Sequence, residues 1–336
     1  MNASQVASIR GGGYSSNSSG KDSIEDTKET KSAQELQEDA INNIAMCFQM
    51  ALLAGAVGIA SVFWESYKRK NKQHFQLSIS NLSVVEQSDL CFYAYDFIFA
   101  AGLYRVYRLF QNQSKKGAVD RMSPHNLQKL YQTISWLWFG VTVSFSLDGV
   151  IMVASELKLP MFMVVSTVFA FIANFPVGEW FHRHSQQQHL ANDKSLVAGK
   201  EYARARKIGL RAARDMLWSV GGIILSGVVD LMDFAIKTVH ANSAEEKVGI
   251  AFGGLLDVSE SITIGGLLAS LYFTLVRVVI TSTKRDFSSK NDASDFKEYY
   301  EAQSKFYGRV ASFFGFQALF TILEYVYQIV ESLWFK

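Results

Sequence analysis

Three aspartates stand in long apolar stretches of this sequence, and each follows small residues at the same spacing. They are Asp148, Asp230 and Asp257. The small residues eight and four positions earlier are Gly140 and Ser144, Gly222 and Ser226, and Gly249 and Gly253, respectively. A spacing of four places each aspartate and its small residues on one helix face. Because small residues let helix backbones approach closely in a membrane, each carboxyl is predicted to extend a packing stripe rather than face lipid.

The three aspartates are also predicted to share one depth. If the basic loops lie on one side, the helices bearing Asp148 and Asp230 run outward and the helix bearing Asp257 runs inward. At 1.5 Å per residue, all three carboxyls then lie roughly 10–15 Å below the outer surface. Further acids at a similar depth are Asp233, Glu260, Glu324 and, if its segment crosses the membrane, Asp96. We expect no lysine or arginine at that depth to neutralise them all.

Ionisable side chains inside a membrane span are costly, and by default they suggest a functional site. Desolvation and mutual repulsion disfavour charged carboxylates, so such a group favours binding of a proton or a cation. The predicted ion-binding residues are Asp148, Asp230, Asp257, Asp233, Glu260 and Glu324. The sequence therefore predicts membrane transport of a small cation or proton. The alternative is structural, because a protonated aspartate can simply hydrogen-bond a neighbouring helix.

The elements that must position these acids are transmembrane helices. Although the chain of 336 residues is only 49% hydrophobic, it contains several apolar runs of about 20 residues, the length that crosses a hydrocarbon core. The fold class is predicted to be all-α, a polytopic membrane protein with six or seven spans. The predicted spans are residues 42–64, 90–110, 131–154, 160–181, 216–237, 248–280 and 308–335. The 248–280 run is longer than one span needs, so it should tilt or break near Gly265 and Gly266.

The N-terminal region differs sharply from these runs. Residues 1–38 are rich in serine, glycine, asparagine and charged residues, and they contain almost no apolar material to bury. Such a composition is typical of a disordered tail. The domain division predicted is a disordered tail over residues 1–38 and a membrane domain over residues 39–336.

Loop charges predict how the helices are oriented. The three long loops at residues 111–130, 182–215 and 281–307 are rich in lysine and arginine, which places them on the cytosolic side. The basic residues near 68–72 conflict with this arrangement. If residues 90–110 cross the membrane, that loop lies outside; if they lie in the interface, it stays inside and six spans remain. Seven spans are favoured because residues 90–110 are long and aromatic.

A second interpretation assigns the function to a basic segment at residues 200–214. Its lipid-binding candidates are Arg204, Arg206, Arg211 and Arg214, which would attract anionic headgroups. Under this interpretation the chain is a non-transporting scaffold or membrane-shaping protein, and the aspartates are interhelical hydrogen-bond partners. The segment could also be a plain cytosolic extension of the next span. Either of the later basic loops could instead dock a protein partner.

Other functional classes find little support. The sequence has no nucleophile motif and no nucleotide fingerprint, so an enzyme is not predicted. A net charge of +2 does not indicate a nucleic-acid partner. Glu179 and His182 resemble one half of a dimetal centre, but a carboxylate-bridged centre needs two such pairs and further glutamates. The pattern does not specify a metal or a cofactor, and the partners expected are the lipid bilayer and a proton or small cation.

Overall fold

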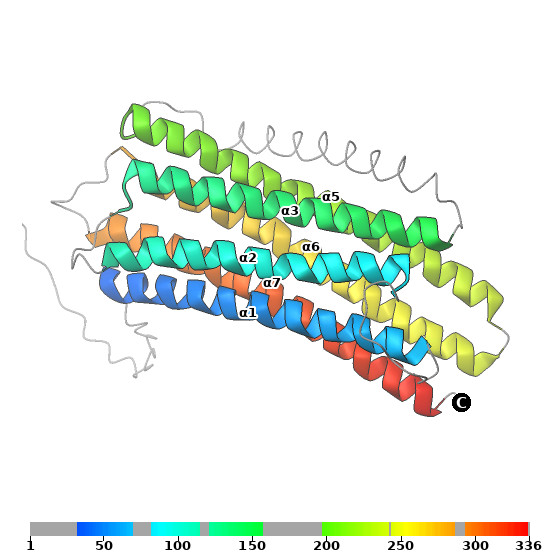
Figure 1. Cartoon of the computed structure of the whole chain (residues 1–336). Helices are drawn as coiled ribbons and strands as arrows, with labels where there is room; N and C mark the ends of the chain where they lie inside the picture. Colours follow the sequence, from blue (N-terminus) through cyan, green and yellow to red (C-terminus); the bar gives the residue numbers. More distant parts are fainter. Residues whose placement is uncertain are drawn as a thin grey trace, which may run out of the picture. The chain divides into compact units, whose positions relative to one another are not determined.

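The computed structural model describes residues 32–69, 82–114, 121–156, 197–241, 243–285 and 293–334, which belong to one compact unit (Figure 1). These residues form six α-helices. They are α1 (Ala33–Arg69), α2 (Val84–Ser114), α3 (Pro124–Glu156), α5 (Lys200–His240), α6 (Ala244–Ser282) and α7 (Ala293–Trp334). The described residues contain no β-strand and only one isolated bridge, between Val197 and Lys284. The all-α prediction is confirmed.

Local sequence signals explain where the first helices begin. Ser32 and Glu35 form a reciprocal capping box: the Glu35 amide donates to the Ser32 hydroxyl at 3.2 Å, and the Ser32 amide donates to the Glu35 carboxylate at 2.6 Å. Ser83 and Glu86 repeat the motif at the start of α2. Helix α1 therefore starts at Ala33 rather than at residue 39, while residues 1–31 of the predicted tail lie outside the described residues.

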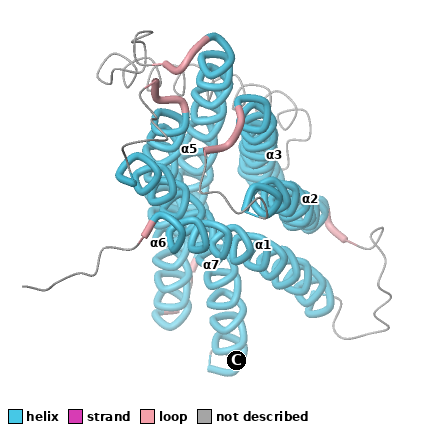
Figure 2. The backbone as a smooth tube through the Cα atoms, turned by 90° about the vertical axis from the view of Figure 1, so that its left-hand side faces the viewer, coloured by secondary structure: helices cyan, strands magenta, loops and turns pink. Residues whose placement is uncertain are grey.

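The six helices contact one another in a closed circuit. Following the contacts, α7 packs on α1, then α1 on α2, α2 on α3, α3 on α5, α5 on α6, and α6 on α7 again. Figure 2 views them nearly end-on. Helices α1, α3, α5 and α7 run in one direction, and α2 and α6 run in the other (Figure 1). Because α3 and α5 are parallel, the chain between residues 156 and 197 connects opposite ends of the bundle; the predicted span 160–181 lies there, outside the described residues.

Polar contacts tie four helices together at the end where α3, α5 and α7 begin, which we call the basic end. Arg121 donates to the Lys284 carbonyl at 2.9 Å, and the Ala198 amide donates to the Thr283 carbonyl at 3.2 Å. The described parts of the three long basic loops therefore lie together, as a shared cytosolic side requires.

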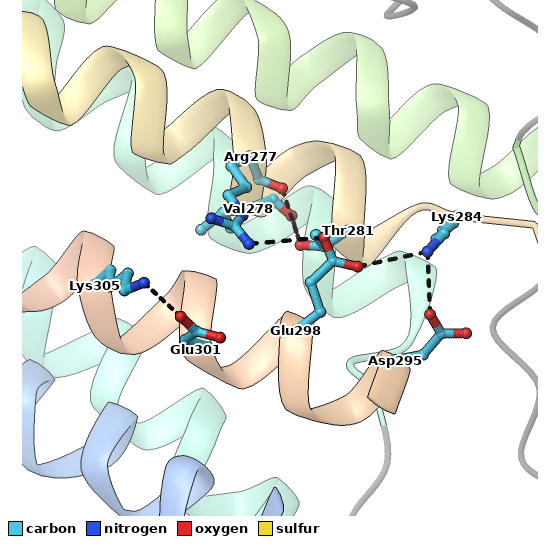
Figure 3. A network of polar contacts seen from close by, with 8 residues as sticks. All are labelled: Arg277, Val278, Thr281, Lys284, Asp295, Glu298, Glu301 and Lys305. Carbon is cyan, nitrogen blue, oxygen red and sulfur yellow. Dashed lines mark hydrogen bonds and ion pairs between the residues drawn. The ribbon is translucent and has the colours of Figure 1, made fainter. Parts of the chain in front are cut away.

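Charged side chains add to this connection between α6 and α7. Lys284 bonds Asp295 at 3.1 Å and pairs with Glu298 at 3.5 Å, and Arg277 reaches the same glutamate at 3.9 Å (Figure 3). The hydrogen bond to Asp295 is the main cause of a raised pKa of Lys284, so the lysine remains charged at physiological pH. The end of α6 and the start of α7 are thus joined by an ionic link.

The centre of the bundle is aromatic where α2, α3 and α7 meet. The centroid of the Phe99 ring lies 4.9 Å from that of Phe314 and 5.4 Å from that of Trp138. The Trp138 and Phe313 ring centroids are 5.6 Å apart, and all three pairs are edge-to-face. These four side chains are buried. Edge-to-face packing of this kind adds about 0.5–1.5 kcal/mol per pair beyond the burial of apolar area. We call this group the aromatic plug.

The outer surface of the bundle is also apolar. Large hydrophobic side chains are exposed on every described helix, for example Leu53 on α1, Ile98 on α2, Trp136 on α3, Ile224 on α5, Phe252 on α6 and Ile322 on α7. Large exposed apolar side chains on every described helix are consistent with contact with a membrane or a partner.

Three of the described helices are long and apolar enough to cross a membrane: Ala33–Lys68, Lys247–Ser282 and Ser294–Val330. They contain most of the predicted spans 42–64, 248–280 and 308–335. Three is fewer than the six or seven predicted. The predicted segments 90–110, 131–154 and 216–237 do form helices, but these helices are not apolar enough by the same measure.

Two of the helices differ in detail from what the sequence indicated. Helix α2 carries Asp96, Arg105 and Arg108 within its apolar stretch, which lowers its hydropathy. Helix α6 runs without interruption past Gly265 and Gly266, so no break occurs there.

Glycines allow tyrosines of α2 to approach neighbouring helices. A Cβ atom at Gly58 of α1 would lie 2.0 Å from the Tyr93 ring, and one at Gly140 of α3 would lie 1.9 Å from the Tyr95 hydroxyl. That hydroxyl donates to the Leu137 carbonyl at 2.8 Å. The packing role predicted for Gly140 is therefore filled by contact with a tyrosine side chain rather than by backbone contact.

We expect Gly58→Ala to lower stability by about 1–3 kcal/mol, because the added methyl group would force α1 and α2 apart. Gly266→Ala in α6 is the matched control, since a Cβ there meets nothing within 4 Å. The control should be neutral or up to about 1 kcal/mol more stable, given the higher helix propensity of alanine. Thermal unfolding in detergent, followed by circular dichroism, measures both; equal midpoints for the two variants would contradict the close approach of Tyr93.

Candidate functional site

Three helices bring four acidic side chains together away from the basic end. Glu324 of α7 hydrogen-bonds Glu260 of α6 and interacts electrostatically with Asp257 of α6 and Glu65 of α1. We call these four residues the carboxyl cluster. Asp257 and Glu260 are three residues apart, so they share the face of α6 that packs on α7. Three of the six predicted ion-binding residues, Asp257, Glu260 and Glu324, therefore lie close together. Glu65 was not predicted from the sequence.

A pocket of about 380 Å³ lies beside the cluster. Its lining comes from α5, α6 and α7 and consists of Phe234, Lys237, Ile250, Gly253, Gly254, Leu256, Asp257, Glu324, Tyr327 and Gln328. The Tyr327 hydroxyl donates to the Gly249 carbonyl at 2.6 Å and so ties α7 to α6 at its edge. A volume of this size is within the range of small-molecule sites and holds several waters, so the carboxyls can exchange protons with solvent.

Two lysines lie next to the cluster, where the sequence indicated no lysine or arginine that would neutralise all of the acids. Lys237 of α5 lines the pocket together with Asp257 and Glu324. Lys68 of α1 donates to the Gln328 side chain at 3.4 Å, and Gln328 in turn donates to Glu65 at 3.0 Å. The predicted depths were those of backbone positions along each helix. A lysine side chain can extend well along the helix axis from its own backbone and so reach a group at another depth.

A tyrosine of α2 completes the surroundings of Glu324. Tyr93 interacts with Thr321 of α7 and lies in the electrostatic range of Glu324, Glu260 and Asp89. It is the same residue whose ring contacts Gly58. Tyr93 stands three residues before Asp96 and therefore on the same face of α2. This spacing is the sequence signal that could have placed Tyr93 among the polar residues of the site.

The remaining predicted acids stay predictions. Asp148 lies in α3, and Asp230 and Asp233 lie in α5, but their side chains are not among those that the structure describes. Helices α5 and α6 do approach closely near Asp230, where a Cβ at Gly227 would lie 3.3 Å from Ser261.

Metal binding finds no support in the described part of the chain. No group of three or more histidine, cysteine, aspartate and glutamate side chains is arranged there to hold a metal ion. The half-motif of Glu179 and His182 lies outside the described residues.

The four arginines predicted to bind lipid divide into two kinds. Arg204 and Arg211 are exposed, whereas Arg206 is buried. Arg214 pairs with Asp215 at 3.2 Å and lies over the Trp218 ring at 4.6 Å.

Asp215, which the sequence reading missed, also accepts a hydrogen bond from Ser135 and joins α5 to α3. Arg206 and Arg214 therefore contribute to the bundle itself. Of the four predicted lipid-binding arginines, only Arg204 and Arg211 have exposed side chains.

Comparison with known proteins adds no template for this site. No protein-family model matches the chain, and no significant match occurs among curated proteins or solved structures.

We expect a cysteine introduced in place of Asp257 to react with a charged, membrane-impermeant maleimide, because Asp257 lines the pocket. The test uses Asp257→Cys in a background in which the two native cysteines, buried Cys47 and exposed Cys91, are replaced. Leu271→Cys on the same helix is the control, since Leu271 is fully buried and the introduced thiol should remain unmodified. Mass spectrometry measures the labelling; an Asp257→Cys variant as unreactive as the Leu271→Cys control would contradict a water-accessible pocket.

Proposed function

We propose that this chain is a multi-pass membrane protein of six or seven spans that moves a proton or a small cation through the carboxyl cluster. The observation that carries the proposal is the contact between Glu324 and Glu260 beside a pocket of about 380 Å³. Both residues belong to helices that are long and apolar enough to cross a membrane. Carboxyl pairs in such surroundings are costly to keep for packing alone.

Seven spans agree best with the course of the described helices. Helix α2 packs against both α1 and α3 and runs antiparallel to them, as a membrane-crossing helix would. Its exposed side chains include Phe97 and Ile98, and α5 exposes Val228 and Ile236 in the same manner. In this arrangement the C-terminal end of α1 lies at the end of the bundle opposite the basic end.

The chemistry of the cluster favours a proton over a metal cation. Two carboxyl groups can hydrogen-bond each other only when one of them carries a proton, so Glu260 and Glu324 together hold one. The proton can leave to water in the pocket, and the resulting negative charge is moderated by nearby Lys237. Glu65, Asp257 and Tyr93 then set how readily the pair releases it, because each places an oxygen or a charge close to Glu324.

A second candidate function, that of a non-transporting scaffold, is favoured by the basic face of α5. Arg204, Lys207 and Arg211 are exposed and lie on adjoining turns at the basic end. Each could contribute about 1 kcal/mol of attraction to an anionic membrane surface. The same face could also bind an acidic protein partner.

Proton flux into proteoliposomes, followed with an internal pH-sensitive dye, tests the proposed function. We expect Glu324→Gln to reduce flux to the level of empty vesicles, because glutamine keeps the side-chain shape but cannot release a proton. Glu38→Gln is the matched control, since Glu38 is exposed on α1, and it should leave flux unchanged.

A panel of monovalent and divalent cations in the same vesicles separates proton from cation transport. Absence of any flux by the native chain would contradict the proposal. If substitution of Arg204 and Arg211 then weakened binding to anionic vesicles, the scaffold function would be preferred.

A further inference from the structure

A second acid lies deeper in the bundle than the carboxyl cluster. Asp96 of α2 is only 5% exposed, and Gln317 of α7, also 5% exposed, donates to its Oδ2 atom at 3.0 Å. On the α1 side, Gly55 lies against Asp96, since a Cβ there would be 3.1 Å from the Asp96 Cβ. The only neighbouring titratable group with a described effect is the Tyr95 hydroxyl on the same helix. No cation of the described residues pairs with Asp96.

A polar face of α7 connects Asp96 with the cluster. Gln317, Thr321 and Glu324 are four and three residues apart, a spacing that aligns them along one side of the helix. The Thr321 hydroxyl donates to the Gln317 carbonyl at 3.0 Å, and Tyr93 interacts with Thr321 while lying close to Glu324. Tyr93 is also one turn from Asp96 on α2. Gln317 and Glu324 are separated by seven positions, which corresponds to roughly 10 Å along the helix axis.

The polar face ends at Asp96. One turn further toward the basic end, Phe99 follows Asp96 on α2 and Phe314 precedes Gln317 on α7, and their rings are in contact at 4.9 Å. Trp138 and Phe313 close the remaining space as part of the aromatic plug. A polar route that begins at the pocket thus stops at a buried carboxyl group, with tightly packed rings beyond it.

We propose that Asp96 is a second proton-binding site, at the inner end of a route that starts at Glu324. This inference rests on the proposed function. An isolated carboxylate at this position would be strongly disfavoured, because burial removes its hydration and no described cation replaces it. The neutral acid keeps the hydrogen bond from Gln317 through its carbonyl oxygen. Transfer breaks the O–H bond of Glu324 and forms one on the Asp96 carboxylate, leaving Glu324 ionised, and the proton then leaves toward the basic end when the rings of the aromatic plug move apart.

The test combines chemical modification with flux on the full chain in proteoliposomes. Dicyclohexylcarbodiimide enters apolar regions and reacts with protonated carboxyl groups, and peptide mass spectrometry locates the product. We expect Asp96 of the native chain to be modified and proton flux to fall as it reacts. Asp96→Asn should abolish flux while its melting temperature remains close to that of the native chain, because asparagine can still accept the bond from Gln317. Glu201→Gln, an exposed acid on α5, is the control and should leave flux unchanged.

The outcomes separate this inference from the proposed function. Flux that is lost in Glu324→Gln but retained in Asp96→Asn would overturn the role of Asp96 and leave the cluster as the working site. A native chain in which Asp96 stays unmodified across the pH range would also overturn it, and this readout needs no variant to fold. Absence of flux by the native chain would overturn both.

Discussion

The hydrogen bond between Glu260 and Glu324 is the interaction on which the account depends. Two carboxyl groups repel each other when both are charged, and burial between helices strengthens that repulsion. In the proposed account they stay together because they share a proton and because α6 and α7 are joined at both ends. Tyr327 joins these helices beside the pocket, and Lys284 joins them at the basic end.

The closed circuit of helices explains how one small site can draw on so many elements. Because α7 contacts both α1 and α6, Glu324 meets side chains from each of them, while α5 supplies Lys237 to the same pocket. Helix α2 contributes Tyr93, whose ring fits only because α1 has a glycine at position 58. The small side chain at position 58 thereby allows the tyrosine to lie close to Glu324.

Much of the fold could be predicted from local patterns. The apolar runs indicated the helices. Ser32 with Glu35 and Ser83 with Glu86 also have the spacing of three that is typical of a helix start, although residues 1–38 were predicted to form a disordered tail. Part of the site could be predicted as well, because Asp257 and Glu260 share a face of one helix and Glu324 was placed at a similar depth. Counting residues along a helix gives depth but not rotation about its axis. Hence the sequence could not indicate that Glu65 lies near Glu324, that Lys237 lines the pocket, or that Asp96 faces Gln317.

Infrared spectroscopy of the chain in lipid at neutral pH tests the shared proton most directly. The account predicts a carbonyl band of a protonated carboxylic acid in the native chain that is lost in Glu324→Gln and changed in frequency in Glu260→Gln, since each substitution removes one partner of the pair. The Glu38→Gln control should match the native spectrum. Identical acid bands in the native chain and in Glu324→Gln would mean that Glu324 does not take part in holding a proton, and would contradict the central claim.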